Sequence, residues 1–149
     1  MTMTKSEMRE AVLAAKVAKG LDWEQIAAQV GCAPVFLCAA CLGEHSLTGE
    51  QAQRLAAVLD LDDATARALT EYPVKGQRGE ALMNDPLVYR FKEISLVYGE
   101  AIKLIVQEKF GDGIMSAIDF TMDIDRVEDP KGDRVQITMS GKFLPYKRW

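Results

Sequence analysis

The 149-residue chain contains only one histidine and three cysteines. An odd number of cysteines argues against a framework of disulfide bonds and is typical of a protein from a reducing compartment. The apolar runs are far shorter than the roughly 18 residues that a membrane-spanning helix needs. The N-terminal segment MTMTKSEMRE has no apolar signal core. We therefore expect a cytoplasmic protein with no membrane partner.

Positive charge is also scarce. The formal net charge is −4, and residues 1–80 carry 8 Lys and Arg against 11 Asp and Glu. The stretch from Trp23 to Gly43 has the layout of a helix-turn-helix, with Gly31 in the turn. Its second helix, Pro34–Leu42, has no Arg, Lys, Asn, Gln, Ser or Thr to contact bases or phosphates. This pattern predicts a helical domain that has this common packing arrangement but binds no nucleic acid.

The sequence has no HExxH, Walker, GxGxxG or GxSxG motif. A zinc site is one alternative, because Cys38 and Cys41 have C-x₂-C spacing and Cys32 and His45 are nearby. However, Cys38 and Cys41 would lie one turn apart on an apolar helix, without the loop that structural zinc sites generally use. A buried cysteine behaves as a small hydrophobic residue. We therefore expect the cysteines to pack, His45 to be a solvated or capping residue, and no metal to bind.

The composition changes near residue 80, and the chain is expected to be an α+β protein of two domains. Residues 1–80 are predicted to form an all-helical, repressor-like bundle that contains the helix-turn-helix-like element. Residues 81–149 are predicted to form a second domain that dimerises. The Gly- and Pro-containing segment 72–79 is interpreted as the linker. Capping residues and glycines predict the first helices: one ending at Lys19, then 23–30, 34–43 and 49–59, with a turn or helix after Asp62.

The second domain has the pattern of one long helix followed by a β-hairpin. Asp85 and Pro86 form a strong helix start, and the helix is expected over residues 87–110. Its apolar residues cover a wide arc, which predicts burial on more than one side. Alternation of apolar and polar side chains and a turn-forming segment predict the hairpin: strands at 114–127 and 135–143 around a turn at 129–133.

The predicted hairpin is too small to be stable by itself. A two-stranded hairpin is marginal in water, and a single helix covers it poorly. Long strands would also leave open edges. We therefore expect the second domain to intertwine with a second copy, strand against strand, giving at least an obligate dimer.

Three polar side chains in this half are candidates for function. Arg90 and Glu93 are three residues apart and share one helix face. They form either a surface ion pair or, among apolar neighbours, a semi-buried pair with a functional role. Ser116 is the only polar residue on the apolar strand face before Arg126. Taken alone, Ser116 is expected to bond to a nearby backbone carbonyl.

Specific motifs run through both halves of the chain. The second half contains Asp85-Pro86, YRFxE at 89–93, Val97-Tyr98-Gly99, EKFGDGIMSAIDF at 108–120, Asp129-Pro130 and GKFLP at 141–145. The first half contains WEQIAA at 23–28 and Leu42-Gly43. In this combination the chain resembles the cyanases (cyanate hydratases, or cyanate lyases). The resemblance covers essentially the whole chain.

The resemblance implies a reaction of cyanate with bicarbonate that gives carbamate and carbon dioxide. Carbamate then decomposes to ammonia and a second carbon dioxide. It implies no metal or organic cofactor. It implies that Arg90, Glu93 and Ser116 are catalytic. It also implies that these three residues meet at subunit interfaces of a decamer built from five dimers. The alternative is a repressor-like regulator or a non-catalytic oligomerisation module. A regulator would need polar groups on the apolar segment 35–42.

Overall fold

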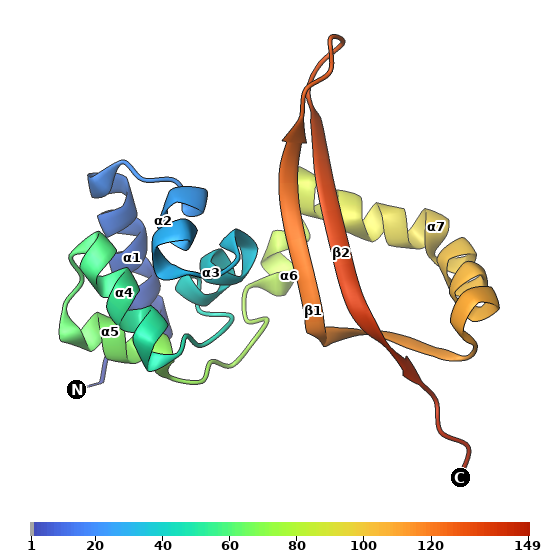
Figure 1. The fold of residues 1–149 in the computed structure, drawn as a ribbon, viewed down its shortest axis with the longest axis horizontal. Coiled ribbons are helices and arrows are strands. Elements are labelled where there is room, and N and C mark those ends of the chain that lie inside the picture. Colours follow the sequence, from blue (N-terminus) through green and yellow to red (C-terminus); the bar gives the residue numbers. More distant parts are fainter. Residues whose placement is uncertain (1) are drawn as a thin grey trace. The chain divides into compact units, whose positions relative to one another are not determined.

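A computed structural model describes residues 2–149. Helices occupy the first half, and a long helix and a hairpin dominate the second (Figure 1). The elements are α1 (Lys5–Lys19), α2 (Trp23–Val30), α3 (Pro34–Cys41), α4 (Gly49–Leu59), α5 (Asp63–Thr70), α6 (Gly79–Leu82), α7 (Pro86–Phe110), β1 (Gly113–Val127) and β2 (Arg134–Pro145). The predicted α+β fold class is confirmed.

Capping boxes begin three of the first helices. Thr4, Asp22 and Thr48 each accept a hydrogen bond from a backbone N–H one turn into the helix. The side chain at that position bonds back to the backbone of the cap, which completes a capping box. Each cap contributes about 1 kcal/mol to helix stability. The predicted starts of α2 and α4 are confirmed, and α1 is capped by Thr4, one of the two residues proposed for it.

The helical half has a hydrophobic core of its own. Each of the helices α1–α5 contributes buried apolar side chains, and the largest of these are Met8, Ile26, Leu37, Leu55, Leu59 and Leu69. Full burial of a side chain of this size contributes about 1.5–3 kcal/mol. Cys41 is also fully buried in this core, as predicted for a cysteine that packs. No single helix within residues 2–149 is long and apolar enough to cross a membrane, and α2 with α3 meets that criterion only as a pair bent by 97°.

The chain divides into two compact units. One comprises Met1–Lys75 with Asp123–Gln136, and the other comprises Gly76–Met122 with Ile137–Trp149. The short helix α6 lies at the start of the second unit and was not predicted. A single turn of four residues has no periodic apolar face by which a sequence pattern could reveal it.

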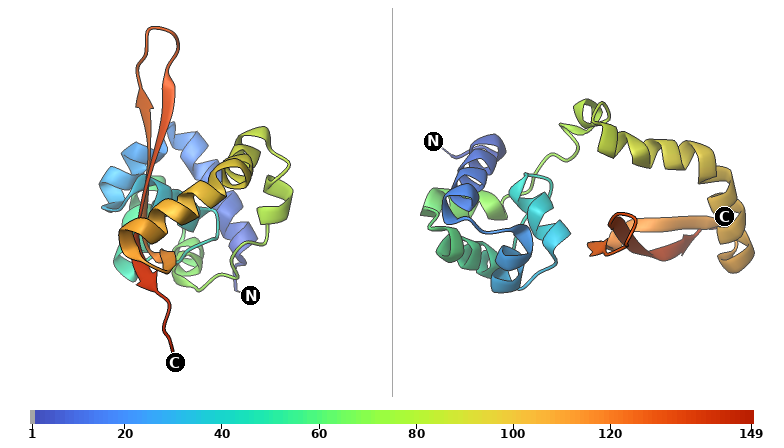
Figure 2. Two further views of the ribbon diagram at one scale, coloured as in Figure 1. Left: turned by 90° about the vertical axis from the view of Figure 1, so that its right-hand side faces the viewer. Right: turned by 90° about the horizontal axis from the view of Figure 1, so that it is seen from above.

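The long helix α7 has a well-defined start and end. The Asp85 carboxylate accepts hydrogen bonds from two backbone N–H groups of the first turn, and Pro86 is the first helical residue. Gly111, with φ of +94°, ends the helix where the sequence predicts. Figure 2 shows that α7 bends along its length. The Ser95 hydroxyl donates to the Phe91 carbonyl at 2.9 Å, a bond of the kind that bends helices.

Strands β1 and β2 form the predicted two-stranded hairpin (Figure 1). Asp129 closes its turn, because its carboxylate accepts from the N–H of Lys131 and its carbonyl accepts from the N–H of Gly132. The two strands are unequal, with 15 residues in β1 and 12 in β2. Strand β1 therefore has residues that cannot all pair one to one with residues of β2.

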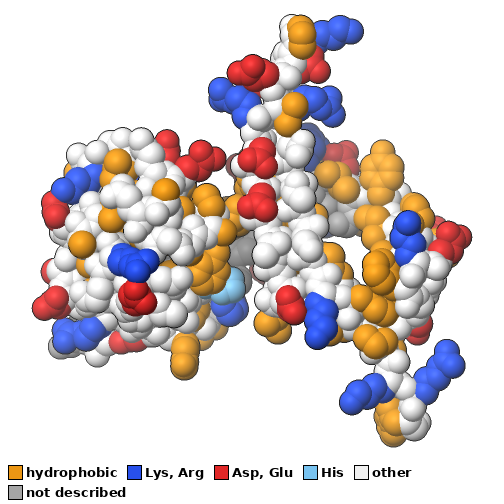
Figure 3. Space-filling view, in the orientation of Figure 1, with side chains coloured by type: hydrophobic (Ala, Val, Ile, Leu, Met, Phe, Trp, Pro, Cys, Tyr) orange, Lys and Arg blue, Asp and Glu red, His pale blue; other side chains and the backbone are white. Residues whose placement is uncertain are grey.

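The second half leaves most of its apolar side chains exposed. No residue of α7 is buried, and hydrophobic side chains gather along it (Figure 3). Leu96 is 71% exposed, and Ile118 on β1 is 99% exposed. The predicted burial of α7 and of the apolar strand face is therefore wrong for a single chain. A lone helix and a two-stranded sheet cannot cover each other on all the faces that the sequence makes apolar.

Candidate functional site

Helix geometry brings Arg90 and Glu93 together on α7. The Arg90 Nη1 donates to the Glu93 Oε2 at 2.8 Å, across one helical turn. The side chains are 58% and 49% exposed, so in the single chain this is a surface pair worth at most about 1 kcal/mol. The pair still fixes the direction of the guanidinium. The planar fork of Arg90 keeps donors for an anion beyond the one that Glu93 uses.

Ser116 is a buried residue near the beginning of β1. It is 5% exposed, and its Oγ accepts hydrogen bonds from the N–H groups of Ile118 at 3.1 Å and Asp119 at 2.9 Å. The prediction that its hydroxyl bonds to a backbone carbonyl is therefore wrong. The oxygen accepts twice, so its two lone pairs are occupied and its proton is left to donate.

The two bonds to Ser116 also mark a bend in β1. In a regular strand, successive N–H groups point to opposite sides. The N–H groups of Ile118 and Asp119 both reach one oxygen, so the strand is irregular at this point. The unequal strand lengths fit this irregularity. Ser116 is thus held by its own backbone in a non-standard segment.

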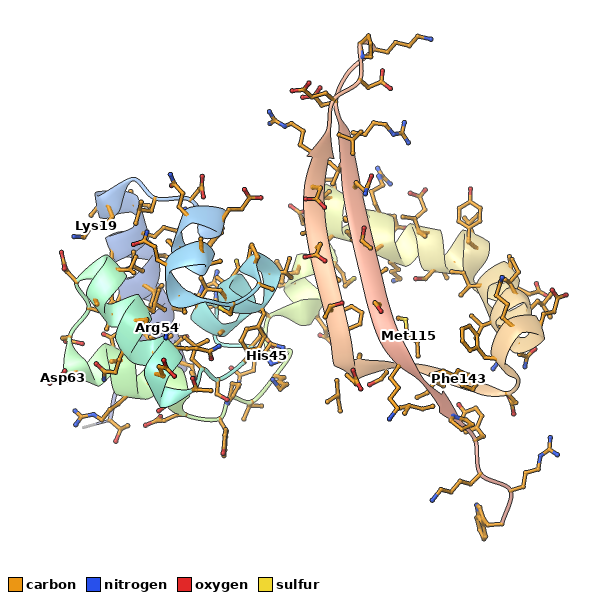
Figure 4. All side chains as sticks on the ribbon, in the orientation of Figure 1. Lys19, His45, Arg54, Asp63, Met115 and Phe143 are labelled. Carbon is orange, nitrogen blue, oxygen red and sulfur yellow. The ribbon has the colours of Figure 1, made fainter. Side chains whose placement is uncertain are left out.

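The base of the hairpin holds this segment near the end of α7. Phe110 of α7 and Phe143 of β2 stack with ring centroids 5.2 Å apart. The N–H of Tyr146 donates to the carbonyl of Asp112 at 3.1 Å, and Lys103 pairs with the Asp112 carboxylate at 3.5 Å. Figure 4 shows Met115 of β1 and Phe143 of β2 at the same end of the hairpin. The segment that leads into Ser116 is therefore anchored both to α7 and to the end of the hairpin.

The three predicted site residues are not joined within one chain. Arg90 and Glu93 bond to each other, and Ser116 bonds to β1. In residues 2–149, no hydrogen bond or ion pair recorded for these side chains links α7 to Ser116. The ion pair and the serine lie on elements with large exposed apolar faces. That Arg90, Glu93 and Ser116 meet at a subunit interface therefore stays a prediction.

The cysteines have the chemistry of packed thiols. Burial, together with the neighbouring Cys38 and Cys32, raises the pKa of Cys41 to about 12. Burial also raises the pKa of Cys38, although the positive charges of Lys16 and Arg9 oppose this. All three thiols are free. Within residues 2–149, no group of three or more His, Cys, Asp and Glu side chains is arranged to hold a metal ion.

His45 is exposed in the loop between α3 and α4. Its ring lies 5.3 Å from that of Phe36, and its Nδ1 is 3.0 Å from the Nζ of Lys75. Partial burial lowers the pKa of His45, the charge of Lys75 lowers it further, and Glu44 opposes both. The imidazole therefore accepts from the ammonium group, which links the segment after α5 to the loop that precedes α4.

Family models and relatives agree along the chain. The model "Cyanate hydratase, N-terminal" matches residues 5–73, and "Cyanate lyase C-terminal domain" matches residues 80–148. The cyanate hydratase of Pseudomonas putida is 53% identical over 99% of this chain and 100% of its own length. The cyanate hydratase of Synechococcus sp. (strain CC9311) is 51% identical over 97% of this chain and 96% of its own.

A solved structure agrees with the sequence comparisons. The crystal structure of cyanase from T. urticae matches with a TM-score of 0.82 at 37% sequence identity, and the match covers 93% of this chain and 96% of that chain. Sequence identity of about one half over nearly the full length, with this shared fold, identifies the family. The chain belongs to the cyanate hydratase family.

Proposed function

We propose that the protein catalyses the bicarbonate-dependent decomposition of cyanate. One observation carries this proposal: the chain is 53% identical to a cyanate hydratase over 99% of its own length. Cyanate and bicarbonate give carbamate and carbon dioxide with uptake of one proton. Carbamate takes up a second proton and decomposes to ammonia and another carbon dioxide. The protein acts as a lyase without a metal or organic cofactor.

The chemistry begins when a bicarbonate oxygen attacks the cyanate carbon. The new C–O bond gives an adduct that then loses carbon dioxide. The bond from this oxygen to the bicarbonate carbon breaks as carbon dioxide leaves, so the oxygen stays on the cyanate carbon, which becomes the carbamate carbon. The nitrogen takes up two protons, one that bicarbonate brings and one from solution. Both substrates are anions, so their approach is opposed by Coulomb repulsion, which is stronger in a site of low polarity than in water. The main tasks of the protein are to hold the two substrates close together and to offset their charge.

Arg90 supplies the positive charge. Its planar guanidinium offers paired donors that match carboxylate-like oxygens, which a compact ammonium group does not. Glu93 bonds to Arg90 at 2.8 Å and so fixes the orientation of the guanidinium. An ionised Glu93 repels both substrates, so its role is to position Arg90 or to handle the proton.

Ser116 supplies a hydrogen bond to one substrate. Its oxygen already accepts from two backbone N–H groups, which favours its role as a donor. A nucleophilic role would need an oxygen lone pair and a nearby base, and the lone pairs are engaged by Ile118 and Asp119. The proposed mechanism therefore has no covalent serine intermediate.

The active assembly is a homo-oligomer, a decamer made of five dimers, in which Arg90 and Glu93 meet Ser116 at subunit interfaces. The exposed apolar faces of α7 and β1 support self-association, because contiguous apolar surface of this kind marks an interaction site. The apolar helix α3 (Pro34–Cys41) supports the absence of nucleic acid among the partners. Three free thiols support the cytoplasm as the compartment.

Ammonia release from cyanate tests the proposal directly. The purified protein should release ammonia from cyanate only when bicarbonate is added, with two molecules of carbon dioxide for each ammonia. Omitting bicarbonate from the same preparation is the control. Absence of ammonia release with both anions present, from a protein that is folded and assembled, would contradict the proposal.

A further inference from the structure

Gly141 of β2 lies unusually close to Ser116 of β1. A methyl group added at Gly141 would overlap the carbonyl oxygen of Ser116 and would lie 2.5 Å from the Cγ of Met115. Real Cβ atoms do not approach other heavy atoms closer than 3.0 Å. The backbones of the two strands therefore approach each other at this point as closely as only a glycine permits.

This close approach occurs at the irregular segment of β1. The Ser116 hydroxyl is oriented by the N–H groups of Ile118 and Asp119, and that geometry depends on where the Ser116 backbone lies. The Ser116 carbonyl cannot move away from β2 without moving the rest of the residue. A side chain at Gly141 would push on that carbonyl and so turn the hydroxyl.

We propose that Gly141 is a positioning residue, which holds the Ser116 hydroxyl in its productive orientation by letting β2 press against the Ser116 backbone. This inference rests on the proposed function, because it assigns Ser116 a part in the reaction. Gly141 itself touches no substrate. Its effect on activity passes through Ser116 alone.

A second crowded glycine shows that the effect is local. A methyl group at Gly113 would lie 2.6 Å from the Cζ of Phe143 and would overlap the carbonyl of Leu144. Gly113 therefore makes room for the ring that stacks on Phe110. Its crowding falls on the end of β2, whereas that of Gly141 falls on Ser116 and its neighbour Met115.

A double-mutant cycle on the full-length protein tests the proposal. Bicarbonate-dependent kcat/KM for cyanate is measured for the wild type, Gly141→Ala, Ser116→Ala and the double variant, with oligomeric size checked for each. Gly141→Ala should lower kcat/KM at least about tenfold in the wild-type background and less than about twofold in the Ser116→Ala background. Gly49→Ala is the control and should keep wild-type activity, because no atom lies within 4 Å of its added methyl group.

A second variant separates Ser116 from Met115. In Gly141→Ala with Met115→Ala, the side chain that the new methyl group meets is shortened, but the overlap with the Ser116 carbonyl remains. The loss of activity should persist in this variant. If Gly141→Ala alone fails to assemble, this variant replaces it in the cycle.

The outcomes are distinct. The positioning role would be overturned by equal losses of kcat/KM in both backgrounds or by wild-type activity of Gly141→Ala. It would also be overturned if shortening Met115 restored activity, or if both Gly141→Ala variants failed to assemble. Full activity of Ser116→Ala, or no activity in the wild type, would instead contradict the proposed function and its site. Coupled losses in kcat/KM with the oligomer retained support the inference.

Discussion

The helical half and the hairpin half of the chain bury their apolar side chains in different ways. Met8, Leu37 and Leu55 in the helical half are fully buried within the single chain. In the hairpin half, no residue of α7 is buried and Ile118 is 99% exposed. Both halves are rich in apolar residues. The first therefore carries its own core, and the second exposes apolar faces that the proposed oligomer would cover.

The two halves also differ in whether they contain the candidate catalytic residues. The helical half contains the cysteines and the histidine. The cysteines are free thiols that pack in this half, and the imidazole of His45 is hydrogen-bonded to Lys75. The hairpin half contains Arg90, Glu93 and Ser116, and the single chain leaves them in two groups. In the proposed function, the site is completed by assembly and so forms only when the apolar faces are covered.

Placing a charge on the apolar face of β1 should have the largest effect. Ile118→Asp should prevent assembly and abolish activity, because a buried, unpaired carboxylate is strongly disfavoured. Light scattering and the ammonia assay measure the two effects. The matched control is Val17→Asp on α1, a residue that is 78% exposed in the half with its own core. If Ile118→Asp assembled like the wild type, the β1 face would not be an interface.

Arg90→Lys keeps the charge of the site but removes the planar fork. The specificity constant should fall at least about a hundredfold, on the order of 3 kcal/mol of transition-state stabilisation. Steady-state kinetics with cyanate and bicarbonate measure this loss, and light scattering should show an unchanged oligomer. Glu93→Gln tests whether charge or hydrogen bonding matters beside Arg90. Full activity of Arg90→Lys would remove Arg90 from the site.

Shortening a core side chain of the helical half should lower stability rather than activity per folded site. Leu55→Ala should reduce the free energy of unfolding of this half by about 2–5 kcal/mol, because it leaves a cavity in a fully buried position. Denaturant unfolding followed by circular dichroism measures the change. Val17→Ala, at an exposed position, should change stability by less than about 0.5 kcal/mol. Equal effects of the two changes would contradict the placement of Leu55 in the core of the helical half.

Acid should weaken the contact between Lys75 and His45. Burial and Lys75 lower the pKa of folded His45, so the unfolded state binds its proton more readily. The stability contributed by neutral His45 is fully present above its unfolded pKa of about 6.5 and is lost as the pH falls through the folded pKa. The free energy of unfolding should therefore fall less between pH 8 and pH 5 in His45→Gln than in the wild type. Identical pH profiles would contradict this role of His45.

Chelation should have the smallest effect. A thiol whose pKa is raised to about 12, such as Cys41, remains protonated at neutral pH, and metal ligation requires the thiolate. Activity and thermal unfolding should be unchanged after exhaustive dialysis against a chelator. Elemental analysis before and after dialysis provides the control. Stoichiometric zinc that is lost together with activity would show that the Cys38–Cys41 spacing forms a metal site.

Local signals in the sequence were sufficient to predict most elements. Caps such as Asp22 and Thr48 and stops such as Gly111 act within one turn of the chain, so the sequence alone reveals them. The period-2 pattern of β1 likewise predicted its strand. The single turn of α6 was missed because four residues carry no period, and α3 ends at Cys41, two residues before the predicted end at Gly43.

The site was less predictable than the fold. The spacing of Arg90 and Glu93 was enough to predict their contact, because a helix places residues three apart on one face. The backbone partners of Ser116 were predicted wrongly. A bend that turns two successive N–H groups towards one oxygen has no period-2 signature. The sequence shows Gly141 only as part of the motif GKFLP, since close approach between strands depends on their pairing and not on sequence spacing.

Mixing two inactive variants tests most directly whether the site is completed between copies. Arg90→Lys and Ser116→Ala would be co-expressed with different affinity tags, and mixed oligomers would be isolated through both tags. If Arg90 of one copy acts with Ser116 of another, some sites in the mixture contain both wild-type residues. The account predicts that bicarbonate-dependent ammonia release rises well above that of either variant alone. Mixed oligomers that remain as inactive as their two components would contradict it.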